Sequence, residues 1–127
     1  MTHESQRRGR VLVIDDERPV AVAIQRTLHK HHDVVICTSS PDALQRLLSG
    51  EAFDAIICDL MMPQLTGMDV HAELMKVMPE LARRMIFLTG GAFTAEARAF
   101  LDDASNVHIE KPFDAEQLRA LVNDRVR

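Results

Sequence analysis

Residues 11–16 read Val-Leu-Val-Ile-Asp-Asp, an unbroken apolar run that ends in two carboxylates, Asp15 and Asp16. Such a run lacks the alternation of apolar and polar residues, which is typical of a strand covered on both faces of a parallel sheet. Four more short apolar runs lie along the chain, near residues 33–37, 54–58, 84–88 and 107–109. Longer segments with helical spacing separate these runs, and this alternation predicts a doubly wound α/β fold with helices on both faces of the sheet.

Five helices are expected between and after these runs. The first starts near Pro19, a residue suited to the first turn of a helix. The others span about residues 41–49, 65–78, 94–103 and 114–126. Apolar spacing predicts the buried faces, which in the second helix are Ala43, Leu44, Leu47 and Leu48 and in the third are Met68, Ala72, Met75 and Val77.

The composition limits the class of protein. With 127 residues, 46% of them apolar and 27% charged, the chain has the size and make-up of one globular domain. We expect residues 1–9 to form a flexible tail and residues 10–127 to form the folded domain. The net charge of −4 and the lack of a basic stretch argue against direct contact with nucleic acid.

The sequence also bears on the compartment. No stretch reads as a signal peptide or as a membrane span, so we expect a cytoplasmic protein without a membrane partner. Cys37 and Cys58 each end an apolar run and are expected to be buried free thiols, which fits a reducing compartment.

Polar residues follow the apolar runs at the points where the strands are expected to end. Asp15 and Asp16 follow the first run, Asp59 the third, Thr89 the fourth and Lys111 the fifth. The carboxyl ends of parallel strands meet at one edge of the sheet, where α/β proteins bind their ligands. The sequence therefore predicts that three carboxylates, a hydroxyl and an ammonium gather in one site.

Acidic residues at such an edge point to Mg²⁺, which prefers one or two carboxylates, waters and phosphate oxygens. Asp16 and Asp59 are the expected carboxylate ligands, Asp15 is expected to hold a coordinated water, and the Met61 carbonyl is a candidate backbone ligand. A divalent cation favours the ionised forms of crowded carboxylates and neutralises an incoming phosphoryl group, so an aspartate can act as nucleophile. This chemistry predicts a Mg²⁺-assisted phosphoryl acceptor.

Two further residues suit the binding of phosphate. Lys111 carries a compact charge on a long stem, which allows it to pair first with a carboxylate and later with a phosphoryl oxygen. Thr89 can donate a hydroxyl hydrogen bond to a second oxygen. Lys111–Pro112 is a candidate cis peptide bond, because the cis isomer is accessible at X-Pro bonds.

The ordered set of motifs resembles the receiver domains of two-component response regulators. The similarity covers about positions 10 to 125, and it rests on Asp15-Asp16, the segment Asp59-Leu60-Met61-Met62-Pro63 with Gly67-Met68, Thr89 at the end of a strand, and Lys111-Pro112-Phe113. Each motif is weak alone, whereas the ordered set is specific. The resemblance implies a (βα)5 flavodoxin-like sandwich with a five-stranded parallel sheet of strand order 2-1-3-4-5.

The resemblance also implies a phosphorelay function in which Asp59 is the phosphoacceptor for a histidine kinase or histidine phosphotransfer protein. Asp15 and Asp16 would be the acids that hold the cofactor Mg²⁺, and Thr89 and Lys111 would be the switch and phosphate-binding residues. Phosphorylation would remodel the surface of the fourth helix, fifth strand and fifth helix for a downstream protein target or a homodimer. The protein would be a signalling domain and not an enzyme, assisting only its own phosphorylation and dephosphorylation.

The chain departs from the pattern of that family at three places. The switch aromatic, expected three residues before the lysine, is His108 where Tyr or Phe is usual, so the strength and pH dependence of the switch stay open. Gly90 and Gly91 make the loop after Thr89 permissive. Met61 offers no polar side chain to orient an attacking water, so we expect slow loss of the phosphoryl group.

Other functions remain open on the sequence alone. A receiver-like interaction module that is never phosphorylated would use the same charges for stability. An aspartyl-phosphate phosphohydrolase usually needs a second acid two residues after the nucleophile, where this chain has Met61. A flavodoxin-like cofactor carrier is disfavoured, because Asp15 and Asp16 would repel a flavin phosphate. The stretch from Leu88 to Phe93 is similar to receivers of hybrid histidine kinases, which leaves a single-domain regulator and part of a larger protein as alternatives.

Overall fold

The computed structural model describes residues 7–91 and 94–127 and contains one sheet of five strands, paired in parallel throughout. The strands are β1 (Arg10–Ile14), β2 (Asp33–Cys37), β3 (Ala55–Asp59), β4 (Ile86–Thr89) and β5 (His108–Glu110). Their order across the sheet is β2-β1-β3-β4-β5. The doubly wound, flavodoxin-like fold predicted from the sequence is therefore confirmed.

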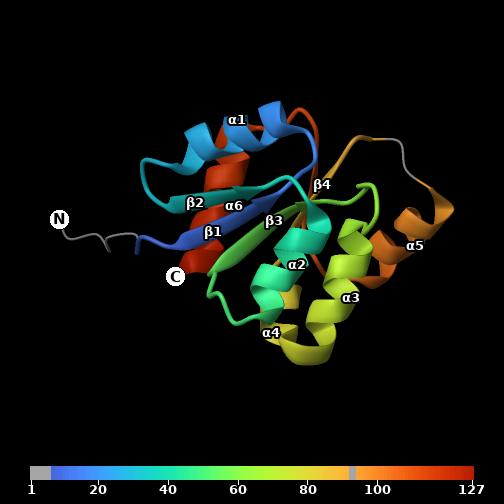
Figure 1. The fold of residues 1–127 in the computed structure, drawn as a ribbon. Coiled ribbons are helices and arrows are strands. Elements are labelled where there is room, and N and C mark those ends of the chain that lie inside the picture. Colours follow the sequence, from blue (N-terminus) through green and yellow to red (C-terminus); the bar gives the residue numbers. More distant parts are fainter. Residues whose placement is uncertain (1–6, 92–93) are drawn as a thin grey trace.

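Helices cover both faces of this sheet. They are α1 (Arg18–Leu28), α2 (Ser40–Leu48), α3 (Gly67–Val77), α4 (Pro79–Arg83), α5 (Ala95–Asp103) and α6 (Ala115–Val126). Figure 1 shows α1 and α6 on one face and the other helices on the opposite face. The two layers leave the carboxyl ends of the strands open at one edge.

Alternate residues of the central strands fill two apolar cores, one on each face of the sheet. From β1, Val11 and Val13 pack with α1 and α6, whereas Leu12 and Ile14 pack with the helices of the opposite face. All four side chains are completely buried. The apolar runs lack alternation because both faces of each central strand are covered.

The short helix α4 is absent from the sequence prediction. Proline disfavours helical backbone at the residue before it. Met78, which precedes Pro79, has φ −139° and ψ 63° and separates α3 from α4. The helix expected over residues 65–78 is therefore shorter, and the chain forms a second helix before β4.

The buried face predicted for the third helix is largely wrong. Of the four expected residues only Met68 packs on the core, since Ala72 is exposed and Met75 and Val77 are 36% and 59% exposed. Leu48 of α2, also predicted to face inward, is 49% exposed. The buried residues of α3 are Gly67, Val70 and Leu74.

A cluster of aromatic rings accounts for the face that α3 buries. The His71 ring lies 5.1 Å from the Phe100 ring of α5 and 6.0 Å from the Phe87 ring of β4. Burial lowers the pKa of His71, which favours the neutral imidazole. A neutral imidazole packs as an aromatic side chain, so the half-buried His71 contacts these rings although the residue type reads as polar.

The structure describes only the last three residues of the segment expected as a flexible tail. Residues 1–6 lie outside the described part of the chain, whereas Arg7, Arg8 and Gly9 contact the domain. The Arg7 guanidinium donates to Asp54 at 2.7 Å, and the buried Gly9 N–H donates to Nδ1 of His32 at 3.1 Å.

The environment of the cysteines and the character of the helices can both be compared with the sequence. Cys37 and Cys58 are buried and free, as predicted. Within residues 7–91 and 94–127, no helix combines the length and apolar character that crossing a membrane requires.

Candidate functional site

The polar residues at the strand ends come together at one edge of the sheet. Asp15 follows β1, Asp59 is the last residue of β3, Thr89 is the last residue of β4 and Lys111 follows β5. Asp15, Asp59 and Thr89 are buried, and the Lys111 side chain is 18% exposed. The structure therefore brings these four predicted residues to a common edge.

Backbone hydrogen bonds continue the sheet past the strand ends and hold these residues in place. The Asp15 N–H donates to the Cys37 carbonyl at 3.2 Å, and the Lys111 N–H donates to the Thr89 carbonyl at 2.8 Å. Lys111 and Thr89 consequently leave the sheet side by side, although one follows β5 and the other ends β4.

The Lys111 ammonium links the acids of the site. Its Nζ lies 3.0 Å from Oε1 of Glu17, 3.2 Å from Oδ2 of Asp15 and 3.3 Å from Oδ2 of Asp59. The contacts with Glu17 and Asp59 are hydrogen bonds, while the contact with Asp15 is an ion pair without that geometry. One cation therefore offsets part of the charge of three carboxylates.

Burial and crowding change the acidity of these groups. Burial and the nearby charge of Asp15 raise the pKa of Asp59 to about 6, against the opposing effect of Lys111. Burial also raises the pKa of Asp15, outweighing the hydrogen bond from the Glu17 N–H. Partial burial acts to lower the pKa of Lys111, but the Glu17 hydrogen bond and the two aspartates raise it overall. A further cation at this site would stabilise the ionised carboxylates.

The donor atoms fit a hard metal ion. Oxygen atoms of Asp15, Glu17 and Asp59 lie within 4.8 Å of one another. Oδ2 of Asp15 is buried and accepts no hydrogen bond from the described residues, which suits a ligand of Mg²⁺. Asp16 is exposed, and its role as a ligand stays a prediction, as does that of the Met61 carbonyl. The Met61 N–H donates to Oδ1 of Asp59 at 3.4 Å.

Glu17 is the member of this cluster that the sequence analysis did not single out. It is the N-cap residue of α1, yet its side chain makes no capping hydrogen bond. Its N–H donates to Oδ1 of Asp15 at 2.8 Å, and its carboxylate reaches Lys111 instead. The available signal was an acid two residues after Asp15, the residue that follows β1. The turn of the chain that brings the two acids together cannot be read from residue types.

Thr89 offers an unused donor. Its side chain is 2% exposed, and Oγ1 has no hydrogen-bond partner within the parts of the chain that the structure describes. Buried hydroxyls normally pair, so an unpaired one beside Lys111 suits an oxygen-bearing ligand.

The residues that depart from the receiver pattern lie on β5 and in the segments that follow β3 and β4. His108 is the exposed first residue of β5 and pairs in register with Phe87 of β4. Gly91 has a φ of 90°, a left-handed conformation that favours glycine. Ala92 and Phe93 lie outside the described residues. The Lys111–Pro112 peptide bond is cis, as the sequence suggested.

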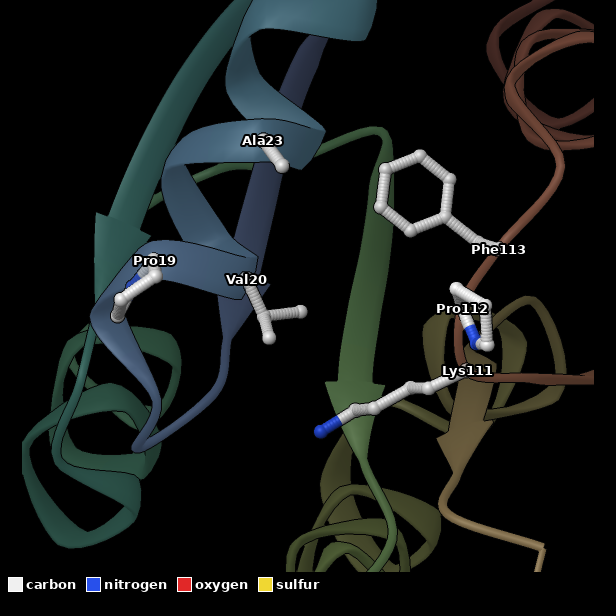
Figure 2. A pocket seen from close by; sticks show the side chains of 6 residues that line it. All are labelled: Pro19, Val20, Ala23, Lys111, Pro112 and Phe113. Carbon is white, nitrogen blue, oxygen red and sulfur yellow. The ribbon is translucent and has the colours of Figure 1, made fainter.

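An apolar pocket of about 280 Å³ opens beside Lys111. Figure 2 shows α1 on one side of this pocket and the segment that follows β5 on the other. Its lining residues are Pro19, Val20, Ala23, Lys111, Pro112 and Phe113. The charged site therefore borders an apolar surface that the sequence analysis did not predict.

Sequence comparison identifies relatives among transcriptional regulatory proteins and response regulators. Residues 11–123 match the family model of the response regulator receiver domain. Transcriptional regulatory protein DltR of Streptococcus agalactiae serotype III (strain NEM316) is 33% identical over 119 residues, which cover 93% of this chain and 52% of that protein. Response regulator MprA of Mycolicibacterium vanbaalenii is 31% identical, over 93% of this chain and 50% of that protein. The chain thus spans about half the length of these relatives.

Solved structures show the same fold. The receiver domain of Francisella response regulator 1452 has a TM-score of 0.77 and 27% identity, covering 93% of this chain and 96% of that one. A response regulator receiver domain from Clostridium thermocellum has a TM-score of 0.80 and 28% identity, covering 92% and 93% of the two chains. Together with the family match and the acidic edge site, these similarities establish that the chain belongs to the response regulator receiver domains, the signalling domains of two-component systems.

Proposed function

We propose that this domain accepts a phosphoryl group on Asp59 in a Mg²⁺-dependent reaction, with a histidine kinase or histidine phosphotransfer protein as donor. The observation that carries the proposal is the position of Asp59. Its side chain is 8% exposed at the open edge of the sheet, 3.3 Å from Lys111, and shares that edge with Asp15. A buried nucleophile paired with a cation and a second acid is the arrangement that metal-assisted phosphoryl transfer needs.

The residues that would hold Mg²⁺ are Asp15, Asp16, Asp59 and the Met61 carbonyl. Mg²⁺ supplies positive charge that stabilises the ionised nucleophile and the transferring phosphoryl oxygens. Support comes from the buried Oδ2 of Asp15, which accepts no hydrogen bond from the described residues, and from the raised pKa of Asp59, since both favour a cation at this edge.

In the proposed step an oxygen of the Asp59 carboxylate attacks the phosphorus of a phosphohistidine. The P–N bond breaks, the imidazole leaves with the bonding electron pair, and an aspartyl phosphate forms. Lys111 pairs with one phosphoryl oxygen, and the Thr89 hydroxyl donates to another. The free Thr89 donor and its backbone link to Lys111 support this assignment.

The apolar pocket beside Lys111 supports a protein donor. A macromolecule that presents its phosphohistidine to a buried aspartate must cover the surrounding surface, and interface cores are more apolar than the rest of a protein surface. The pocket joins α1 to the segment after Lys111, so a partner bound there lies next to the entrance of the site.

We further propose that phosphorylation changes the surface formed by α5, β5 and α6. These elements correspond to the fourth helix, fifth strand and fifth helix of the receiver domains that the sequence resembles. This surface would bind a downstream protein or a second copy of the domain. The exposed His108 lies on it and is the proposed switch residue. We expect this domain to make no direct contact with nucleic acid.

Intact mass after incubation with acetyl phosphate and Mg²⁺ tests the acceptor. We expect a gain of one phosphoryl group in the wild type and in Asp42→Asn, a matched change of an exposed aspartate in α2. Asp59→Asn should gain none. Omission of Mg²⁺ should abolish the gain.

Two outcomes would overturn the proposal. A folded wild-type protein that gains no mass would indicate a receiver-like interaction module that is not phosphorylated. Continuous turnover of a small phosphate ester would indicate an aspartyl-phosphate phosphohydrolase.

A further inference from the structure

Three acids contact the Lys111 ammonium, and Glu17 is the nearest of them. The Nζ to Oε1 distance is 3.0 Å, compared with 3.2 Å to Asp15 and 3.3 Å to Asp59. The Glu17 side chain is 62% exposed, whereas the side chains of Asp15 and Asp59 are 0% and 8% exposed. Glu17 therefore holds the lysine from the solvent side of the site.

The start of α1 places Glu17 there. As the N-cap residue it has an extended backbone, with φ −92° and ψ 97°, and its carbonyl accepts the first N–H groups of the helix from Val20 and Ala21. Its own N–H donates to Oδ1 of Asp15 at 2.8 Å. The backbone of Glu17 thus orders one acid of the site while the side chain binds the lysine.

We propose that Glu17 is a positioning residue that holds Lys111 across the entrance of the site in the unphosphorylated domain and releases it when Asp59 is phosphorylated. The inference rests on the proposed function, because it names the residue that holds Lys111 before Lys111 moves to the phosphoryl group on Asp59.

The physical argument is a competition for one ammonium. Glu17 can offer Lys111 a single negative charge in partly solvated surroundings, where ion pairs are weak and exchange readily. An aspartyl phosphate offers more charge in a more buried position and wins the lysine. In the unphosphorylated domain, however, Glu17 adds a negative charge within 4.8 Å of the nucleophile. That charge repels an anionic phosphodonor, so Glu17 slows phosphorylation.

The first test compares wild type, Glu17→Gln and the control Glu80→Gln. Glu80 lies in α4, which precedes β4, whereas the site lies where β4 ends. The Glu80 side chain forms an exposed ion pair with Arg83. Both variants change the net charge equally. The saturating Mg²⁺ concentration is first determined for each protein, so that an effect on metal affinity is distinguished from an effect on the transfer rate. Rates of phosphorylation by acetyl phosphate are then measured by intact mass at that concentration.

Glu17→Gln should react roughly three- to tenfold faster than wild type, because one repulsive charge near the nucleophile is removed. The advantage should shrink as ionic strength rises, since salt screens an exposed charge. Glu80→Gln should react like wild type. A salt-independent change, or equal rates for Glu17→Gln and wild type, would overturn the role of Glu17 and leave Asp59 as acceptor. Absence of phosphorylation in all three proteins would overturn the proposed function and this inference with it.

A second test examines the contact without phosphorylation. Urea unfolding of wild type, Glu17→Gln, Lys111→Met and the double variant, in Mg²⁺-free buffer, measures the coupling between the two side chains. We expect a favourable coupling that weakens with salt. Additive effects would show that Glu17 does not hold Lys111 in solution.

Discussion

Lys111 Nζ lies 3.3 Å from Oδ2 of Asp59, a carboxylate that stands 52 positions earlier in the chain. The pair joins the central strand β3 to the edge strand β5 across β4, so the two side chains meet only because the sheet is complete. Both groups are shielded from solvent, which makes their charges strong determinants of stability and reactivity.

Asp59→Asn should stabilise the Mg²⁺-free domain at neutral pH. The folded protein raises the pKa of Asp59 from 3.8 to about 6, so the folded state binds a proton more tightly than the unfolded state. This group therefore makes wild-type stability fall as pH rises through about 6. At pH 7 we expect the variant to be more stable by on the order of 2 kcal/mol. Urea unfolding at a series of pH values should show the difference shrinking as the pH falls toward 4.

Met61→Gln should shorten the lifetime of the aspartyl phosphate. Met61 is 40% exposed two residues after Asp59 and gives a water molecule no hydrogen bond from its side chain. An amide at this position can orient the attacking water, so hydrolysis should accelerate by roughly threefold or more. Loss of mass after removal of acetyl phosphate measures the rate. Met75→Gln, the same change on the exposed face of α3, should keep the slow wild-type rate, and a rapid wild-type rate would contradict the role assigned to Met61.

Gly67→Ala should destabilise the domain near the site. A Cβ at this position would lie 2.6 Å from the Asp59 carbonyl oxygen and 3.0 Å from the Leu60 Cα, both backbone atoms that cannot move aside freely. We expect a loss of about 2 kcal/mol, measured by urea unfolding. Gly90→Ala is the matched change, since a Cβ there meets no atom within 4 Å. Equal effects of the two substitutions would rule out a special close approach at Gly67.

His32→Ala should destabilise the end of the sheet far from the site. The imidazole is 1% exposed, accepts the Gly9 N–H at Nδ1 over 3.1 Å, and has Nε2 2.7 Å from Oδ1 of Asn123. Truncation leaves buried polar partners behind, so we expect a loss of about 2–3 kcal/mol in thermal or urea unfolding. His31→Ala, at an exposed neighbour, should change stability by less than about 0.5 kcal/mol.

Two predictions from the sequence, the buried face of the third helix and the number of helices, failed for different physical reasons. The stripe of Met68, Ala72, Met75 and Val77 has helical spacing, but so does the stripe that α3 buries, and residue polarity alone ranked them wrongly. The choice depends on the rings of Phe87 and Phe100, which lie opposite His71 in the folded chain. The extra helix α4 escaped because a five-residue helix carries too little periodicity to be recognised.

The sequence by itself determined the doubly wound fold and most of the site. Unbroken apolar runs require cover on both faces, and parallel strands end at one edge, so Asp15, Asp59, Thr89 and Lys111 had to be neighbours. The tertiary structure alone decided which acid takes the lysine from the solvent side, where the apolar pocket opens, and which hydroxyl stays unpaired. These features depend on backbone turns and on distances between residues far apart in the chain, and residue types and spacing do not encode such distances.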